Sequence, residues 1–144
     1  MKFVSTSANV VNGEFKLDLD RSCKCRVALV EFNLPNINQQ NCDENSVEIS
    51  CHQIDSTFDN PHRILKTICF NRLRGESYYN QWTTQNFEFH EIDSQDKFLT
   101  FTIKRAVGGK GIKFHKSLTA ENPTVFFTLA FEPIRDVHAR WSAI

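Results

Sequence analysis

The chain has 144 residues, and its 17 Lys and Arg balance its 17 Asp and Glu, so its formal net charge at pH 7 is zero. A chain of this length forms one domain and buries a sizeable core without the help of disulfides or metal. The even charge balance gives no overall field that would attract nucleic acid or an anionic membrane, so we expect neither as a partner. A protein close to zero net charge tends to associate, which favours an oligomer.

The five cysteines, at positions 23, 25, 42, 51 and 69, have no spacing typical of a metal site. Cys23 and Cys25 would lie on the same side of a strand, where a local disulfide does not form. We therefore expect reduced thiols buried as small apolar groups. The first residues contain no long apolar run, so we expect no signal peptide, no membrane span, and synthesis in the reducing cytoplasm or nucleus.

Thirteen Phe against one Met is a composition typical of strands and of a core filled by rings. Residues 2–11 are mildly β-prone and are expected to form an edge strand or an arm. Asn12-Gly13 predicts a hairpin turn, because both residues tolerate positive φ. The following half-buried strand has alternating apolar residues at Phe15, Leu17 and Leu19.

Residues 24–35 predict the central strand. Alternation places Ala28, Val30, Phe32 and Leu34 on one face. It places Cys25, Val27 and Leu29 on the other face. The second face becomes polar at Glu31 and Asn33, and Pro35 ends the strand before a polar loop.

Residues 46–51 predict another half-buried strand through the alternation of Val47, Ile49 and Cys51. After this strand, the spacing between apolar residues changes. Over 61–74 the apolar residues follow helical spacing, with Asp59 or Asn60 as N-cap and Gly75 beyond the end, so the sequence predicts one short amphipathic α-helix. Its basic face is interpreted as a solvated surface and not as a nucleic-acid site.

The loop after this helix contains three aromatic residues with polar tips, Tyr78, Tyr79 and Trp82. Residues of this type are enriched in protein interfaces, so we take the three as candidate interface residues, with packing on the core as the alternative.

Residues 86–92 and 97–104 predict a hairpin across a polar link, with a glycine-rich turn at 108–111 and a short strand at 112–115 to follow. The last strand, 124–131, is apolar on both faces. Such a strand lies in the middle of a sheet or has its outer face covered by another subunit, which makes Phe126 a candidate contact. The tail carries an apolar Trp141, which is a further candidate contact if the tail docks on another subunit.

No catalytic motif is present. The five histidines have no metal-binding spacing, and His90, Glu91 and Asp93 alternate between the two faces of a strand. We expect no enzyme activity, no catalytic or metal-binding residue, and no cofactor.

The count of seven or eight short strands with one short helix predicts an all-β fold, an antiparallel β-sandwich of the single jelly-roll type. The whole chain, residues 1–144, is predicted to be one domain, with 1–11 as a possible N-terminal arm and 134–144 as a C-terminal tail.

The phrase VALVEFNLPN, at residues 27–36, resembles the segment "VAL.EI..P" of the penton-like, single jelly-roll minor capsid proteins of polinton-type and related eukaryotic DNA viruses and mobile elements. The later order is similar too, with HRILKTICFN after a polar loop, a strand hairpin, and then GIKFHKSL. The resemblance covers roughly residues 3–118.

This resemblance implies a structural virion protein that assembles at capsid vertices beside a major capsid protein, as a pentamer and without catalysis. Two other classes stay open on the residues alone. One is a trimeric fibre-head or tumour-necrosis-factor-like domain that binds a receptor or glycan, and the other is an intracellular β-sandwich interaction module.

Overall fold

The computed structural model describes residues 1–34, 46–69, 78–105 and 124–134. The predictions for the polar loop after Pro35, the glycine-rich turn, the strand at 112–115 and Trp141 lie outside these ranges. In the part of the chain that is described, no helix is long and apolar enough to cross a membrane.

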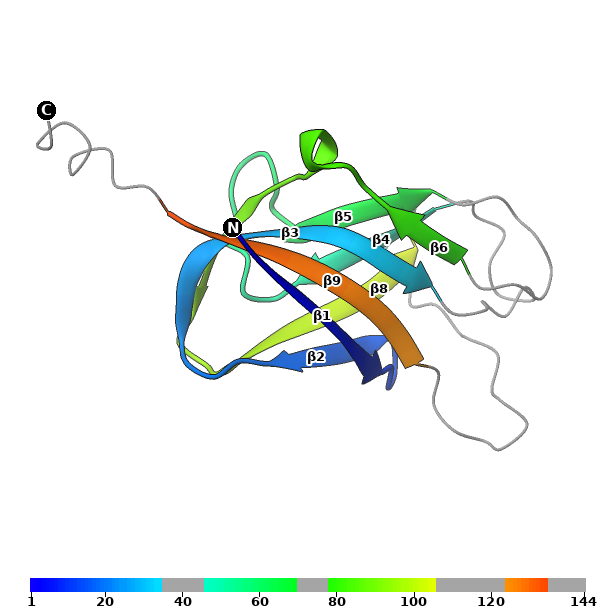
Figure 1. Cartoon of the computed structure of the whole chain (residues 1–144), viewed down its shortest axis with the longest axis horizontal. Coiled ribbons are helices and arrows are strands. Elements are labelled where there is room, and N and C mark those ends of the chain that lie inside the picture. Colours follow the sequence, from blue (N-terminus) through cyan, green and yellow to red (C-terminus); the bar gives the residue numbers. More distant parts are fainter. Residues whose placement is uncertain (35–45, 70–77, 106–123, 135–144) are drawn as a thin grey trace, which may run out of the picture.

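Two antiparallel sheets pack face to face (Figure 1). The first sheet has the order β1-β9-β3, followed by β6 and β7, which pair with different parts of β3. Its strands are β1 (Lys2–Asn9), β9 (Thr124–Pro133), β3 (Cys23–Leu34), β6 (Tyr78–Gln81) and β7 (His90–Ser94). The second sheet has the order β2-β8-β4-β5. Its strands are β2 (Glu14–Asp18), β8 (Phe98–Arg105), β4 (Ser46–Cys51) and β5 (Ile64–Cys69).

This strand order is that of a jelly roll: the chain crosses from one sheet to the other at every connection except those from β4 to β5 and from β6 to β7, and the first strand pairs with the last. β6 and β7 lie next to each other along the same edge of β3, where a jelly roll has a single strand. Residues 82–89 join them and include the short 3-10 turn η2 (Thr84–Asn86). The predicted all-β sandwich of single jelly-roll type is confirmed.

Rings fill the space between the sheets, as the Phe-rich composition predicts. Phe15 of β2 stacks on Phe101 of β8 with ring centroids 4.9 Å apart, and it also contacts Phe127 of β9 at 5.1 Å. Phe32 of β3 completes the group at 6.0 Å from Phe15. Aromatic contacts therefore join both sheets at the centre of the core.

The turn at Asn12-Gly13 forms as predicted, with φ of 54° and 76° at the two residues. Val11 and Glu14 exchange backbone hydrogen bonds of 2.9 and 3.0 Å across it. The strands that it joins then diverge, because β1 pairs with β9 in the first sheet and β2 pairs with β8 in the second. β1 is thus an edge strand, one of the two roles expected for it.

The hairpin predicted over 86–104 is wrong in its pairing. β7 and β8 are both strands, but β7 pairs with β3 and β8 pairs with β2 and β4. The short link between them crosses from one sheet to the other, and alternation within a strand carries no information about which strand it pairs with.

The faces predicted for β3 are wrong in its second half. The pairing with β9 shifts between Leu29 and Glu31, so Val30 is an extra residue in a β-bulge. Phe32 consequently shares the core with Cys25, Val27 and Leu29, whereas Ala28 and Val30 are buried outside that cluster. The same bulge directs Glu31 and Asn33 to the outer face of the first sheet.

The helix predicted over 61–74 is wrong, since residues 64–69 form β5. The pairing with β4 shifts so that Leu65 is an extra residue between Ile64 and Lys66. This bulge places Leu65 and Ile68 in the core three residues apart, which is also a helical spacing.

The residues expected to cap the helix act as turn residues instead. The Asn60 side chain accepts a hydrogen bond from the Ile64 amide and donates one to the Ile64 carbonyl, both at 2.9 Å. Arg63 has a φ of 57°, which a right-handed helix does not allow.

Candidate interaction site on the outer face of the first sheet

Two neighbouring rows of side chains cross the outer face of the first sheet. Strand register places Tyr79, Asn33, Phe126 and Ser7 in one row, on β6, β3, β9 and β1 respectively. The same register places Gln81, Glu31, Thr128 and Ser5 in the next row. Four strands that are distant in sequence thus contribute to one surface, visible as the curved first sheet in Figure 1.

A chain of hydrogen bonds fixes the carboxylate of Glu31 on this surface. Tyr79 donates its phenolic proton to Oε2 of Glu31 at 2.5 Å, and Thr128 donates to Oε1 at 2.6 Å. Thr128 has only one hydroxyl proton, so in the 2.7 Å contact between the two hydroxyls Ser5 is the donor. Both oxygens of the carboxylate are therefore held in place by neighbouring strands.

These hydrogen bonds move two pKa values in opposite directions. Donation by Thr128, and then by Tyr79, stabilises the charged carboxylate and lowers the pKa of Glu31. The bond to Glu31 raises the pKa of Tyr79, because the phenol must keep its proton to donate it. At neutral pH Glu31 is thus negatively charged, and the two hydrogen bonds fix the position of this charge.

We expect Tyr79→Phe to raise the pKa of Glu31 toward the ordinary value near 4.5, because one of the two hydrogen bonds to the carboxylate is lost. A titration of the Glu31 side-chain carboxyl by carbon NMR measures this change. A lowered folded-state pKa contributes stability above the unfolded-state pKa, and this contribution disappears as the pH falls through the folded-state value. The variant should accordingly lose less stability on acidification than the wild type, and an unchanged Glu31 pKa would contradict the assignment.

The surface is hollowed by about 530 Å³ between the side chains of the two rows. The residues that line the hollow are Ser5, Thr6, Ser7, Glu31, Asn33, Tyr79, Phe126, Phe127 and Thr128. Its two outer rings are well exposed, Tyr79 at 61 % and Phe126 at 55 %. Among these described lining residues, Glu31 alone carries a formal charge. We call this region the outer-face hollow.

Of the five candidate interface residues, the fold brings two together. Tyr79 and Phe126 lie in the same row and line the outer-face hollow. Tyr78 lies in β6, but its side chain is outside the described part, as is the whole of Trp141. Glu31, Asn33 and Thr128 were not among the candidates, and only the polar ending of the central strand could have indicated the first two.

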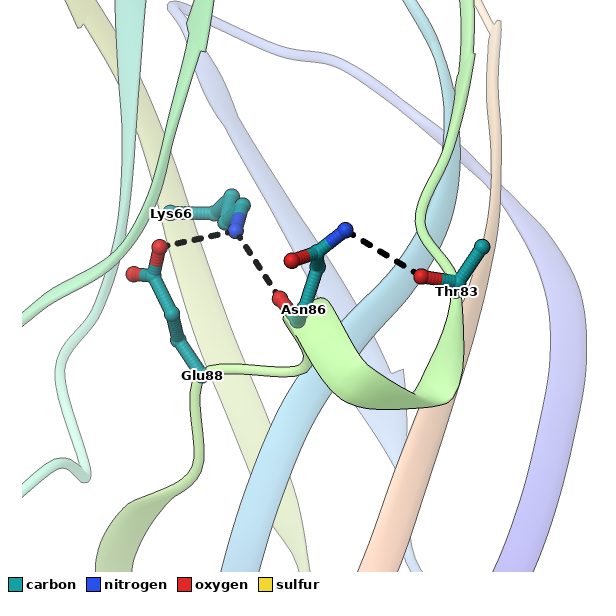
Figure 2. Close-up of polar contacts among 4 residues, drawn as sticks. All are labelled: Lys66, Thr83, Asn86 and Glu88. Carbon is teal, nitrogen blue, oxygen red and sulfur yellow. Dashed lines mark hydrogen bonds and ion pairs between the residues drawn. The ribbon is translucent and has the colours of Figure 1, made fainter.

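Trp82 lies elsewhere, at the edge of the sandwich where residues 82–89 pass β5. It is half-buried and packs on the core, which is the alternative left open for it. Its ring lies over Nζ of Lys66, 5.0 Å from the ring centroid. Nζ of Lys66 also donates to Oε1 of Glu88 at 2.8 Å and to the carbonyl of Asn86 at 3.4 Å (Figure 2). Trp82 therefore holds the two sheets together at this edge.

A second hollow, of about 670 Å³, lies at the opposite end of the β1–β9 pair. Its charged lining residues are of both signs, namely Lys2, Arg21, Lys24, Asp18, Asp20 and Glu132. This balance gives it no preference for a ligand of one charge. None of the candidate interface residues whose side chains the structure describes lines it.

In the described ranges, no three His, Cys, Asp or Glu side chains lie together as a metal site. In the strand segment with His90, Glu91 and Asp93, the two carboxylates are exposed while His90 is half-buried. Burial lowers the pKa of His90.

Comparisons of the chain with protein-family models, with curated proteins and with solved structures give no match.

Proposed function

We propose that this protein is a structural, non-enzymatic subunit of the penton-like minor capsid type, which assembles into oligomers in the virion. The jelly-roll strand order supports this proposal, because many viral capsid proteins have that fold. The resemblance of residues 27–36 to the capsid family is a second, independent support. A pentamer at a capsid vertex, next to a major capsid protein, is the assembly that the proposal names.

The observation that carries the proposal is the pair of exposed rings on the outer face of the first sheet. Phe126 and Tyr79 are exposed on the outer face of the first sheet beside small polar residues. Large aromatic residues on such a surface are typical of the centre of a protein interface, where they contribute more than their neighbours. The outer-face hollow is therefore the proposed contact between subunits.

The test is the solution mass by light scattering on a sizing column, at low and high salt, for the wild type and for Phe126→Asp. We expect a wild-type pentamer and a Phe126→Asp monomer, because a buried charge at an interface centre weakens association by about 30-fold or more. Phe58→Asp is the matched control, since Phe58 is also an exposed phenylalanine, at 99 %, but lies in the loop between β4 and β5.

A pentamer that dissociates only in Phe126→Asp supports the proposal. A pentamer that keeps its mass in Phe126→Asp would show that subunits meet elsewhere. A wild-type trimer would instead favour the fibre-head class. As a control, a circular dichroism spectrum must show that the Phe126→Asp variant stays folded.

A further inference from the structure

The outer-face hollow presents a negative charge, and no cation from the described part of the chain pairs with it. Among the residues that the structure describes, two ion pairs form, Arg26 with Glu132 and Lys66 with Glu88, and neither involves Glu31. A carboxylate offers about four lone-pair positions, and Tyr79 and Thr128 occupy two of them. Glu31 is half-buried, so its remaining positions are open to a donor that enters from solvent.

The rings on either side of this charge provide faces for a cation. Tyr79 and Phe126 lie on strands separated only by β3, which places their backbones about 10 Å apart. Asn33 lies between them in the same row and adds an amide that accepts a hydrogen bond. A planar cation fits beside a ring face while it donates to a carboxylate in the neighbouring row.

The outer face of the first sheet already holds one arginine between a carboxylate and an aromatic ring. Arg26 of β3 donates to Oε1 of Glu132 on β9 at 2.6 Å. Its guanidinium also lies over the ring of Phe89, 5.2 Å from the centroid. At one end of the sheet, therefore, a carboxylate and a ring hold an arginine. At the other end a carboxylate and two rings lie together without one in the described ranges.

We propose that the outer-face hollow binds the arginine side chain of a partner polypeptide, with the guanidinium paired to Glu31 and stacked against Tyr79 or Phe126. Arginine fits better than lysine, because its planar fork donates two parallel hydrogen bonds and stacks on a ring. The inference rests on the proposed function, because both use the outer-face hollow as the contact surface. It adds that the group bound there is an arginine guanidinium.

The test uses capped peptides as probes, namely acetyl-Gly-Arg-Gly-amide and its lysine and citrulline analogues. Citrulline has the shape of arginine but no charge. Binding is followed by the amide shifts of residues 31, 33, 79 and 126 in NMR spectra of the full chain, at a concentration below the assembly midpoint found by light scattering. We expect saturable shifts with the arginine peptide, about tenfold weaker binding of citrulline, and weaker binding at higher salt.

Glu31→Gln is the variant that removes the charge and keeps the side-chain shape and hydrogen-bond acceptor. We expect it to weaken binding of the arginine peptide about tenfold. Glu48→Gln is the matched control, since Glu48 is a similarly half-buried carboxylate on β4 of the second sheet. A thermal melt of each variant shows that the fold is retained.

Equal binding of the arginine and citrulline peptides, or wild-type binding by Glu31→Gln, would overturn the inference. If Glu31→Gln left peptide binding unchanged and lowered the oligomer mass, Glu31 would serve the subunit contact in a way other than by binding an arginine, and the inference would fail while the proposed function stood. This inference and the proposed function fail separately. Glu31-dependent peptide binding together with an unchanged mass in Phe126→Asp would contradict only the proposed subunit contact.

Discussion

Phe127→Ala is expected to lower the free energy of unfolding by about 3 to 5 kcal/mol, whereas Phe126→Ala should change it by less than about 0.5 kcal/mol. The two residues are neighbours on β9, but their side chains leave opposite faces of the first sheet. Phe127 is 2 % exposed and contacts the rings of Phe15 and Phe101 at 5.1 and 5.8 Å. Its truncation leaves a cavity at the centre of the core.

Chemical denaturation followed by circular dichroism and tryptophan fluorescence measures both changes. The dependence of the unfolding free energy on denaturant should stay the same in both variants, so that the shift in midpoint reports stability alone. The measurement must be made below the concentration at which the protein assembles, because assembly adds to apparent stability. A loss of several kcal/mol in Phe126→Ala would show that Phe126 is covered within the monomer, and the outer-face hollow would then not be a free surface.

The sequence predicted those strands whose alternation is uninterrupted. In β2, Phe15 and Leu17 are buried as expected, and in β4 the same holds for Val47, Ile49 and Cys51. The reason is physical: an unbroken strand with one face on the core has a strict period of two. The sandwich class follows from counting such strands, and it was confirmed.

Two of the three wrong predictions, the faces of β3 and the helix over 61–74, come from β-bulges. An extra residue at Val30 exchanges the faces of β3, and an extra residue at Leu65 gives β5 a spacing of three between its core residues. A bulge is selected by the pairing of one strand with its neighbour, so it depends on contacts between residues far apart in sequence. Periodicity within one strand cannot predict it.

The candidate site was predictable only residue by residue. Tyr79 and Phe126 were recognised from their chemical type and from the apolar character of both faces of the last strand. Their position in one row depends on the register of β6, β3 and β9. Glu31 reaches that surface only because of the bulge at Val30, so its role required the structure.

Lys66→Ala is expected to lower the free energy of unfolding by about 2 to 3 kcal/mol, whereas Lys66→Met should change it by less than about 1.5 kcal/mol. The side chain of Lys66 is only 8 % exposed, and its aliphatic part occupies space at the sandwich edge below Trp82. Alanine leaves this space empty. Methionine fills it and removes a charge whose desolvation offsets much of its attraction to Glu88.

Glu88→Gln removes the negative charge from the contact between Lys66 and Glu88 and leaves the packing of the Lys66 side chain unchanged. Glu88 is 59 % exposed, so its carboxylate keeps most of its hydration and the ion pair contributes at most about 1 kcal/mol. Glutamine retains an acceptor for the Lys66 ammonium, and the expected loss is correspondingly small. Denaturant unfolding of the three variants under one set of conditions tests this order. A different result would be equal destabilisation by Lys66→Met and Lys66→Ala. It would show that the Lys66 ammonium, through its bonds to Glu88 and Asn86, joins residues 82–89 to β5, and that packing of the aliphatic part does not.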